Sequence, residues 1–585
     1  MFLNEKIAAI CMVWLMLCSA ASAYYFPEPD WGALLKEKKS MVSQTDFELY
    51  MEGSVSASPY YGAKLEPRGG AYFGMVAETA DFLDPLGAYL TYISMDDRET
   101  DIYYPANEII RRDNCVVTVG YNVSSLGKVD YDTIRRTLEN LASYGKPMLI
   151  RFANEMNVSS LGDEPEEYIR MFRTVADMVH EYENFAVVWS PNDMGALDRP
   201  FSCYYPGDAY VDWVGVSSYM KMYFQGNTAT KDKDATYFMT GDYAWATNAL
   251  KPIITFMEQN GIEKPVMLSE CGVTTENIHK AASEAWAAPR LRNLYYNVLM
   301  KYPQVKLINY FNVYRPEKET YYVHDESGRY KDRTTDKPYA MEIMKEAVSS
   351  GAYISEAGGE PAFVFVPANS GYTAASADGI IDLYTLAHVP KVPQLSVHYY
   401  VDGVWFGERR EAPYKISLDL AGFADGEHTV RIVSNGMEKA YTFIKRGNGI
   451  CFGGEPDGAV LQAAGGAPAN NTIRVLVNGN QVSFDVPPQI IGDRTMVPVR
   501  AIFEALGATV EWIPETKTVK AVRGGTTVTL QIDSASMTVN GQSVTLDVPA
   551  QIVGDRTLVP VRAVSEGFGC RVTWDGAGKT VIVEE

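Results

Sequence analysis

The amino-acid sequence predicts a multidomain protein in which a (β/α)8 TIM barrel is followed by a β-sandwich and an α+β tandem-repeat domain. Three observations carry this prediction. Short apolar runs alternate with amphipathic helical patterns over residues 66–352, turn-separated strand patterns fill residues 360–446, and residues 472–585 contain one segment twice. A chain of 585 residues is too long for one domain, and its 46% hydrophobic content is enough for several cores.

The first 23 residues predict a secretory signal peptide. MFLNEKIAAICMVWLMLCSAASA has a charged start containing Lys6, an apolar run over 7–17 and small residues before Ala23. The apolar run is short for a membrane span, and no second hydrophobic span follows. We therefore expect cleavage after Ala23 and a secreted or cell-surface-associated bacterial protein without a membrane span. Residues 24–65 are expected to form an N-terminal lead-in segment.

Eight apolar runs with helical patterns between most of them predict the strands of the barrel. The helical patterns include YDTIRRTLENLASY and PEEYIRMFRTVADMVHEY. A doubly wound open sheet is the competing topology, but it usually carries a Gly-rich phosphate turn after its first strand, and none is visible. The expected strands are 71–76, 89–94, 115–120, 147–152, 185–190, 211–217, 265–270 and 305–311.

In residues 360–446 the hydrophobic pattern changes from alternating strands and helices to strands alone, which predicts a β-sandwich. AFVFVP, LSVHYYVDGVWFG, YKISLDL, HTVRIVSNG and AYTFIKR alternate with turn residues at intervals that suit such a fold. YYVDGVWFGERREAPYKISLDLAGFADGEHTVRI resembles bacterial immunoglobulin-like domains of exported proteins, which implies a spacer or, less often, a glycan-binding module. Residues 447–471 are rich in Gly and Ala and predict a flexible linker.

The C-terminal segment 472–585 is an internal repeat with a period of 62 residues. VLVNGNQVSFDVPPQIIGDRTMVPVRAIFEALGATVEW returns as MTVNGQSVTLDVPAQIVGDRTLVPVRAVSEGFGCRVTW. The Asn-Gly pair of each copy predicts a tight hairpin, and VPVRAxxExxG predicts a short helix ending at a Gly cap before a Trp-bearing strand. The repeat resembles the copper amine oxidase N-terminal-like module of exported bacterial proteins.

That resemblance does not extend to amine oxidase chemistry. Copper amine oxidases use a His-rich copper site and a Tyr-derived quinone in a separate catalytic domain. None of the six histidines lies in the repeats, so a copper site of the usual kind is not expected there. The better interpretation is a wall- or surface-associated structural module. The histidines stand at positions 180, 279, 324, 388, 398 and 428.

The net charge and the aromatic content limit the kinds of molecule that the protein is expected to bind. The net charge of −21 disfavours binding to nucleic acid or to an anionic membrane surface. The 38 Tyr and 9 Trp residues are ordinary for secreted proteins that handle carbohydrate, because aromatic rings stack on the apolar faces of sugars, although most rings are expected in the core.

Two glutamates follow expected barrel strands on the side where such barrels carry their reactive groups. LIRFANEMN places Glu155 after the fourth strand, and PVMLSECGV places Glu270 at the end of the seventh. These strands lie across the barrel mouth from each other, so both carboxyls can flank one substrate bond. Retaining glycosidases need two carboxyls about 5–5.5 Å apart, an acid/base and a nucleophile. For either glutamate alone a structural ion pair is favoured; both at the correct strand ends favour catalysis.

LIRFANEMN, VVWSPND, YYPGDAYVDWVGVSSY and PVMLSECGV, in this order, resemble glycoside hydrolase family 26, whose best-known members are β-mannanases, and more broadly the retaining barrel enzymes of clan A. The resemblance implies Glu155 as acid/base and Glu270 as nucleophile. It also implies Arg151 as the Arg four residues before the acid/base and Tyr219 as the Tyr that hydrogen-bonds the nucleophile. Trp189 falls at the aromatic near the sugar-binding cleft.

The similarity spans about residues 70–320, with two departures. Asn154 stands where family 26 usually has His; an Asn-Glu pair is typical of other clan A families, where the Asn bonds the sugar 2-hydroxyl. The eighth strand normally supplies a Trp platform, whereas LINYFN offers Tyr310 and Phe311. The barrel and its acid/base chemistry are compatible with these changes, and mannan specificity does not follow from them.

The sequence therefore predicts an exported retaining glycoside hydrolase that acts on a polysaccharide, β-mannan-like or a related β-glycan, without a metal or organic cofactor. The C-terminal repeats would hold the barrel near a cell wall or polymer. The alternative is a non-catalytic carbohydrate-binding or cell-envelope structural protein built on a hydrolase-derived barrel.

Overall fold

The computed structural model forms two compact units, each described here by itself. No helix among the described residues is long and apolar enough to cross a membrane. The predicted signal peptide lies outside the described residues. The described residues are 45–76, 80–83, 85–95, 113–193, 201–220, 245–276, 284–314, 320–324, 335–389, 392, 394–465, 474–482, 484, 488–491, 494–553, 556–575 and 580–584.

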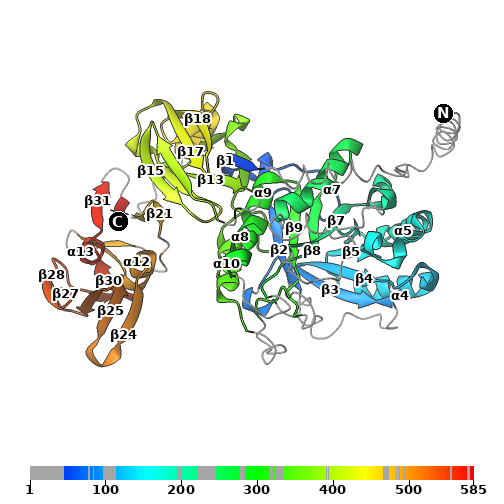
Figure 1. The fold of residues 1–585 in the computed structure, drawn as a ribbon, viewed down its shortest axis with the longest axis horizontal. Coiled ribbons are helices and arrows are strands. Elements are labelled where there is room, and N and C mark those ends of the chain that lie inside the picture. Colours follow the sequence, from blue (N-terminus) through cyan, green and yellow to red (C-terminus); the bar gives the residue numbers. More distant parts are fainter. Residues whose placement is uncertain are drawn as a thin grey trace. The chain divides into compact units, whose positions relative to one another are not determined.

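Eight parallel strands close into a barrel in the first unit (Figure 1). The first and last of these strands pair in parallel, for example Tyr72 with Leu307, so the eight strands close on themselves and the doubly wound alternative is excluded. The predicted fold class is confirmed. The strands are β2 (Ala71–Val76), β3 (Ala88–Ser94), β4 (Val116–Asn122), β5 (Met148–Phe152), β6 (Phe185–Trp189), β7 (Trp213–Met220), β8 (Val266–Val273) and β9 (Val305–Tyr310).

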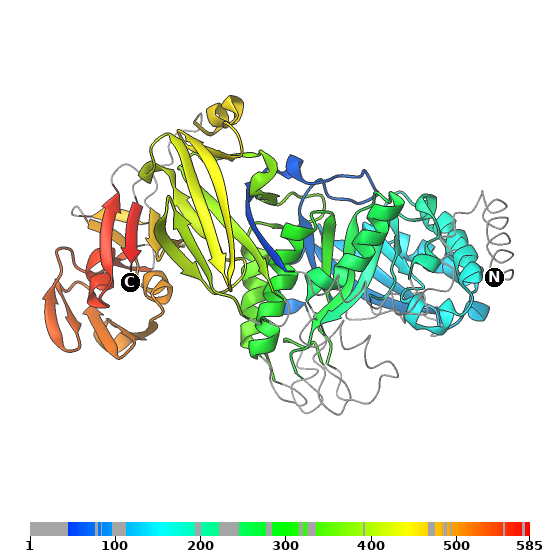
Figure 2. The ribbon, with the colours of Figure 1, turned by 45° about the horizontal axis from the view of Figure 1, so that its top comes forward.

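Amphipathic helices surround the strands, as Figure 2 shows. Asp130 caps the first of them by accepting a hydrogen bond from the backbone N–H of Asp132, and Gly261 ends another in the left-handed region with φ +64°. The helices are α4 (Tyr131–Ala142), α5 (Pro165–His180), α7 (Ala246–Asn260), α8 (Glu284–Arg292), which continues through a π-helical turn (Asn293–Asn297) into α9 (Val298–Lys301), and α10 (Pro338–Ser349).

Every barrel strand contributes at least one residue to a single cluster of buried side chains, and the packing of this cluster stabilises the barrel. Burial of this apolar surface makes a large contribution to the stability of the unit. Polar side chains come next along the strands. Asn309 Nδ2, for example, donates to Thr118 Oγ1 at 3.0 Å. The cluster contains Tyr72, Ala88, Val116, Leu149, Ala186, Val188, Trp213, Met267 and Leu307.

Part of the expected lead-in segment is a strand of the sheet-rich region. β1 (Asp46–Gly53) pairs antiparallel with β11 (Val364–Pro367), and on its other side it neighbours β13 (Ile380–His388). Residues 24–65 are thus not merely a lead-in to the barrel. The alternation in DFELYMEG carried this signal, but its partner strands lie more than 300 residues later in the chain.

The antiparallel, sheet-rich region expected after the barrel is confirmed. A further sheet has the order β12-β19-β18-β17-β14-β15, with every pair antiparallel. β13 also pairs antiparallel with β16 (Ile416–Asp419). The strands of the six-stranded sheet are β12 (Thr373–Ala375), β14 (Val397–Val401), β15 (Val404–Arg409), β17 (Gly426–Ser434), β18 (Met437–Arg446) and β19 (Gly449–Phe452).

The expected flexible linker, 447–471, is in large part regular structure. Its first residues form β19, which is hydrogen-bonded on both sides, to β12 and β18. Helix α11 (Gly458–Gly465) follows. The linker was predicted from Gly and Ala content alone. That prediction overlooked the apolar residues ICF (450–452), whose buried side chains anchor the strand. Residues 466–471 lie outside the described residues.

The two copies of the 62-residue repeat fold alike and share one core. β23 (Arg494–Pro498) pairs antiparallel with its equivalent β30 (Arg556–Pro560), and each leads into a short helix, α12 (Val499–Ala505) or α13 (Val561–Gly567). The Gly after each helix has positive φ, +71° at Gly507 and +83° at position 569, as the predicted cap requires.

Strands of the repeats follow the predicted hairpin signals. The Asn-Gly turn before Asn480 joins β20 (Arg474–Val477) to β21 (Asn480–Gln481), and the second turn joins β27 (Ser536–Val539) to β28 (Gln542–Thr545), with positive φ at all four turn residues. The remaining strands are β22 (Gln489–Ile491), β24 (Thr509–Ile513), β25 (Thr518–Arg523), β26 (Thr526–Gln531), β29 (Gln551–Val553), β31 (Arg571–Asp575) and β32 (Thr580–Glu584).

Lys306 in β9 is buried, and its Nζ donates to Ser58 Oγ at 2.7 Å. Burial lowers the pKa of Lys306 from 10.5 to about 8, against a smaller opposing effect of Glu66. The folded protein therefore binds fewer protons than the unfolded chain between those two values, and stability should rise as the pH rises from 8 to 10.5.

Replacing Lys306 by Met is expected to raise the free energy of unfolding at pH 7 by up to about 3 kcal/mol, since one pKa unit corresponds to about 1.4 kcal/mol. Urea unfolding at pH 7 and pH 10 measures the effect, and the variant should lose the rise between those values. The same substitution at the exposed Lys345 is the control. A Lys306→Met variant that is less stable than the parent at pH 7 would contradict this account.

Candidate active site

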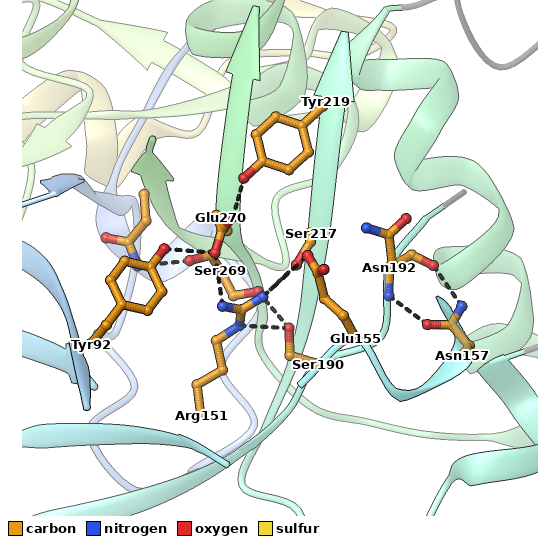
Figure 3. Close-up of polar contacts among 11 residues, drawn as sticks. Tyr92, Arg151, Glu155, Asn157, Ser190, Asn192, Ser217, Tyr219, Ser269 and Glu270 are labelled. Atoms are coloured by element: carbon orange, nitrogen blue, oxygen red, sulfur yellow. Dashed lines mark hydrogen bonds and ion pairs between the residues drawn. The ribbon is translucent and has the colours of Figure 1, made fainter. Parts of the chain in front are cut away.

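The two predicted glutamates lie beside one arginine (Figure 3). Arg151, in β5, is fully buried, and its Nη1 lies 3.0 Å from Glu270 Oε2. Its Nη2 lies 3.8 Å from Glu155 Oε1. Strands β5 and β8 therefore bring both carboxyl groups to the same guanidinium, as expected of groups at the C-terminal ends of barrel strands.

Both oxygens of Glu270 accept hydrogen bonds. Tyr92 donates its hydroxyl to Oε2 at 2.6 Å, and Arg151 donates to the same oxygen. Tyr219 donates its hydroxyl to Oε1. Glu270 is only 8% exposed, so three donors, one of them charged, stabilise a carboxylate that is almost removed from water.

Hydroxyl groups of three neighbouring strands orient Arg151. Its Nε donates to Ser190 Oγ at 3.0 Å, and its Nη2 donates to Ser217 Oγ. Ser190 in turn shares a 2.6 Å hydrogen bond with Ser269 Oγ. These hydrogen bonds fix the orientation of the guanidinium, which a single ion pair would not do.

Irregular strand pairing accompanies these residues. The register between β7 and β8 shifts between Val216 and Ser217, and the register between β8 and β9 shifts between Leu268 and Cys271. Such bulges re-aim side chains and are frequent next to active sites. In this barrel the two register shifts occur next to Ser217 and around Glu270.

Glu155 stands beyond the end of β5 in a left-handed backbone conformation, with φ +56° and ψ +33°. Ala153 is also left-handed, with φ +46°. Non-glycine residues adopt this region at some energetic cost, and such strain concentrates at functional sites. The backbone N–H of Glu155 donates to Ser190 O at 2.8 Å, which stabilises the unusual turn.

Two asparagines secure the loop that follows Glu155. Asn157 is fully buried; its Nδ2 donates to Asn192 O at 2.8 Å, and its Oδ1 accepts from Asn192 N at 2.9 Å. The Glu155 side chain itself is 29% exposed, compared with 10% for Glu270. The site thus contains one tightly held carboxyl and one more open to solvent.

The tyrosines around Glu270 remain protonated well into alkaline solution. Burial, followed by the nearby Glu270 carboxylate, raises the pKa of Tyr92 and of Tyr219 well above the usual value of 10.0. Burial, the largest single effect, would lower the pKa of Arg151, but the charges of Glu270 and of the neighbouring Glu155 and tyrosines together outweigh it and raise that pKa. All three groups therefore stay hydrogen-bond donors to Glu270 near neutral pH.

Three aromatic residues that were expected to bind substrate or to support the site are buried in the structure. Trp189 is fully buried and packs edge to face with Tyr205 at 5.0 Å, so it belongs to the core and not to the cleft. Tyr310 is also fully buried and donates its hydroxyl to Tyr321 O. Phe311 is 8% exposed and packs edge to face on the rings of two site tyrosines, 92 and 219.

These corrections have one physical cause. Side chains alternate between the inside and the outside of a barrel strand. A sequence position at a strand end does not by itself give the direction of the ring. Trp189 and Tyr310 end their strands but point into packed surroundings, whereas Phe311 acts as a brace for the tyrosines that hold Glu270.

Tyr92 is the site residue that the sequence prediction missed. It lies near the end of β3, in the run YLTYIS, so the strand-end rule applied to the other strands would also have selected it. Its ring fits because the neighbouring strand carries Gly120, where a Cβ would come within 2.6 Å of the Tyr92 ring. The pairing of Gly120 with Tyr92 in the β3–β4 register explains this contact.

Replacing Tyr92 by Phe should lower kcat/KM by about 10- to 100-fold, because a hydrogen bond to a charged group contributes about 1.5–3 kcal/mol. Steady-state rates on any hydrolysed glycan would measure the loss. Tyr121→Phe is the matched control, since this buried hydroxyl bonds Thr137 instead. Equal rates for Tyr92→Phe and the parent would show that Tyr92 does not act on Glu270.

No group of three or more His, Cys, Asp or Glu side chains within the described part of the chain has the arrangement of a metal site. The candidate site consists of carboxyl, guanidinium and hydroxyl groups, and Arg151 lies beside both carboxyl groups.

Comparison with known families defines the class of the barrel. Residues 114–287 match the family model described as Glycosyl hydrolase family 26, which includes β5 to β8 and thus both glutamates. Residues 476–583 match the model described as Copper amine oxidase N-terminal domain. Both resemblances expected from the sequence are thus confirmed as matches to these family models, and the match over the barrel supports a glycoside hydrolase.

Solved structures with similar folds include glycoside hydrolases, each at low identity. A modular endo-β-1,4-mannanase from Cellulomonas fimi is 14% identical, covers 64% of this chain and 93% of its own, and has a TM-score of 0.33. A family 26 β-mannanase from Bacteroides ovatus is 15% identical, with 56% and 94% covered and a TM-score of 0.32. A β-glucuronidase from Bacteroides uniformis is 12% identical, with 68% and 47% covered and a TM-score of 0.33. No curated protein matches the chain.

Proposed function

We propose that the barrel hydrolyses β-glycosidic bonds of a polysaccharide by double displacement, with retention at the anomeric carbon. One observation carries the proposal: Glu270 is held by three donors in a nearly dry position, while the more exposed Glu155 lies beside the same arginine. Two carboxyl groups in such different surroundings can perform the two different tasks of this mechanism.

In the first step a Glu270 carboxylate oxygen attacks the anomeric carbon and forms the glycosyl–enzyme bond, while Glu155 gives its proton to the departing glycosidic oxygen. In the second step Glu155 takes a proton from water. The resulting oxygen nucleophile displaces Glu270, which leaves as a carboxylate, and Glu155 is again protonated. Arg151, Tyr92 and Tyr219 hold the Glu270 carboxyl group in a fixed orientation for this attack through their hydrogen bonds.

The substrate proposal is β-mannan or a related β-glycan. It rests on the family 26 match and on Asn154, whose Oδ1 is buried with no hydrogen-bond partner among the described residues. In related clan A enzymes an Asn at this place bonds the sugar 2-hydroxyl, and a substrate hydroxyl would satisfy this amide here. Export, guided by residues 1–23, and attachment to a cell wall through the repeats belong to the same proposal.

A second candidate function is carbohydrate binding without hydrolysis. It is favoured by the burial of Trp189 and Tyr310, which leaves these strand ends without the exposed rings that commonly hold a sugar in a hydrolase cleft. The intact set of donors on Glu270 favours hydrolysis over this alternative.

A substrate screen separates the two functions. The full chain and its Glu270→Gln variant are incubated with β-mannan, β-glucan, xylan and peptidoglycan-associated glycans, and newly released reducing ends are measured. Hydrolysis predicts release from at least one polymer by the parent and none by the variant. Equal inactivity of both proteins on all four, with a folded barrel by circular dichroism, would favour the binding function.

Replacing Glu155 by Gln should slow hydrolysis of a natural glycan by about 10²- to 10⁴-fold, the usual contribution of a general acid. An aryl glycoside with a strongly acidic phenol needs little protonation, so its glycosylation step should be affected far less. The value of kcat/KM, which reports the glycosylation step, is measured on both substrates to test the assignment, with Glu164→Gln as a nearby control. A loss of the same size on both substrates would contradict the acid role.

A further inference from the structure

Exposed aromatic and aliphatic side chains lie on β15, the neighbour of β14. Trp405 is 53% exposed, and its neighbours Val404 and Phe406 are 69% and 37% exposed. Three consecutive exposed apolar residues on an edge strand make this strand a candidate interaction site. The resemblance to immunoglobulin-like domains implied a spacer or, less often, a glycan-binding module, and a spacer alone would not require these residues.

The exposed indole is held in place by cross-strand neighbours. Tyr400 stands opposite Trp405 in the β14–β15 pairing, with ring centroids 5.7 Å apart at 76°. The His398 ring lies 5.6 Å from the indole. On the other side of β14, Arg431 pairs with Tyr400 and places its guanidinium 3.9 Å from the ring centroid. We call His398, Tyr400, Trp405 and Arg431 the Trp405 platform.

This arrangement is pre-organised for stacking. Arg431 covers one face of the Tyr400 ring, and the contacts of Tyr400 and His398 restrict the orientation of the indole, yet about half of Trp405 stays in contact with water. A ligand that stacks on Trp405 therefore meets a ring that loses little conformational freedom on binding.

The charges of the platform favour an uncharged ligand. Arg431 Nη1 lies 3.4 Å from Glu438 Oε2, so its positive charge is already balanced on the protein. A nucleic acid or another polyanion would find no net positive field here, and the chain as a whole carries a charge of −21. A neutral molecule with apolar ring faces and many hydroxyl groups complements both the indole and the balanced ion pair.

Edge-to-edge pairing with another strand fits this surface less well. β15 is an edge strand, but the β14–β15 register shifts between Tyr399 and Tyr400, which pair with Gly407 and Trp405 and leave Phe406 outside the register. Bulges and charged residues blunt strand edges, and β15 ends in Glu408 and Arg409. A ligand therefore has access to the side chains of β15 and not to its backbone edge.

We propose that the Trp405 platform binds a neutral polysaccharide chain by stacking a sugar ring on Trp405, with His398 and the Arg431–Glu438 pair at its margin. This inference goes beyond the proposed hydrolysis, because binding and bond cleavage are separate properties of separate parts of the chain. The platform would raise the local concentration of polymer available to the barrel.

Binding of the full chain to insoluble β-mannan, cellulose and xylan tests the proposal, with Glu270→Gln as the parent so that no polymer is consumed. The parent should bind at least one of the three, and Trp405→Ala in that background should weaken the binding by about tenfold or more, as expected for loss of a central Trp contact. Trp512→Ala is the matched control, since Trp512 is similarly exposed, at 41%, on β24.

A second variant, Trp405→Gln, guards against a folding defect, and circular dichroism monitors both. No binding of the parent to any of the three polymers would overturn the proposal, as would equal binding by the parent and both Trp405 variants. A change from dimer to monomer on sedimentation, with unchanged polymer binding, would assign the surface to self-association instead. Hydrolysis of a short soluble glycan by Trp405→Ala with Glu270 intact should equal that of the wild type, which keeps this test distinct from the proposed catalysis.

Discussion

Glu270→Gln should abolish glycan hydrolysis, with a fall in kcat of at least about 10⁴-fold, since the covalent route depends entirely on this nucleophile. The amide is nearly the same size as the carboxylate. It can still accept at its oxygen, so the barrel should keep its fold. The loss would be measured as the rate of reducing-end release at substrate saturation, where it appears in kcat and not in KM.

Chemical rescue distinguishes a lost nucleophile from a damaged site. In Glu270→Ala the space of the carboxyl is open, and azide can attack the anomeric carbon of an activated β-glycoside directly. One displacement in place of two should give the α-glycosyl azide, the inverted product. Glu276→Ala, a buried glutamate that pairs with Lys337 instead, is the control and should give no azide product. A Glu270→Ala variant that retains full hydrolytic activity would remove Glu270 from the mechanism.

Arg151→Met should be the most destabilising of the site substitutions and should also reduce hydrolysis. Arg151 is fully buried between Glu270 and two serine hydroxyls, so its removal leaves a nearly buried carboxylate without its opposing charge. Breaking such a pair typically costs about 3–5 kcal/mol. Urea unfolding of the full chain, followed by a probe of the barrel, would measure the cost.

Arg290→Met is the matched control. Arg290 is also buried, but its guanidinium stacks on Trp245 and Trp286, and it donates to a backbone carbonyl. Its loss should reduce stability without the steep additional fall in kcat expected for Arg151→Met. If both variants lost stability and activity in the same ratio, Arg151 would have no role at the site beyond stabilising the fold.

The barrel was predictable because each strand is a short apolar run and each helix an amphipathic one. The predicted strand bounds agree with the structure to within three residues at either end; β8, for example, runs from Val266 to Val273. Strand ends also selected Arg151, Glu155, Tyr219 and Glu270, because polar residues after a buried strand have few other reasons to be there.

Features that depend on distant partners were not predictable. β1 pairs with a strand about 300 residues later, and nothing local in DFELYMEG specifies β11 as its partner. The direction of Trp189 and Tyr310 depends on the packing of neighbouring helices, which periodicity does not describe. Tyr92 was missed for a simpler reason: a tyrosine at a strand end is as typical of a core as of a site.

The repeat domain was the most predictable part of the chain. Each local signal, the Asn-Gly turn, the VPVRA helix and its Gly cap, occurs twice and has one structural solution. The 62-residue period makes Trp512 and Trp574 equivalent positions, and they are 41% and 40% exposed. Equivalent exposure fits a structural module in which the same face of each copy meets solvent.

The central claim, double displacement at Glu270 and Glu155, is tested most directly by the configuration of the first product. Proton NMR during early hydrolysis of a β-glycan oligosaccharide distinguishes the newly formed anomers before mutarotation mixes them. Retention predicts that the β-anomer appears first and the α-anomer grows in later. Initial release of the α-anomer would show a single displacement and would contradict the account.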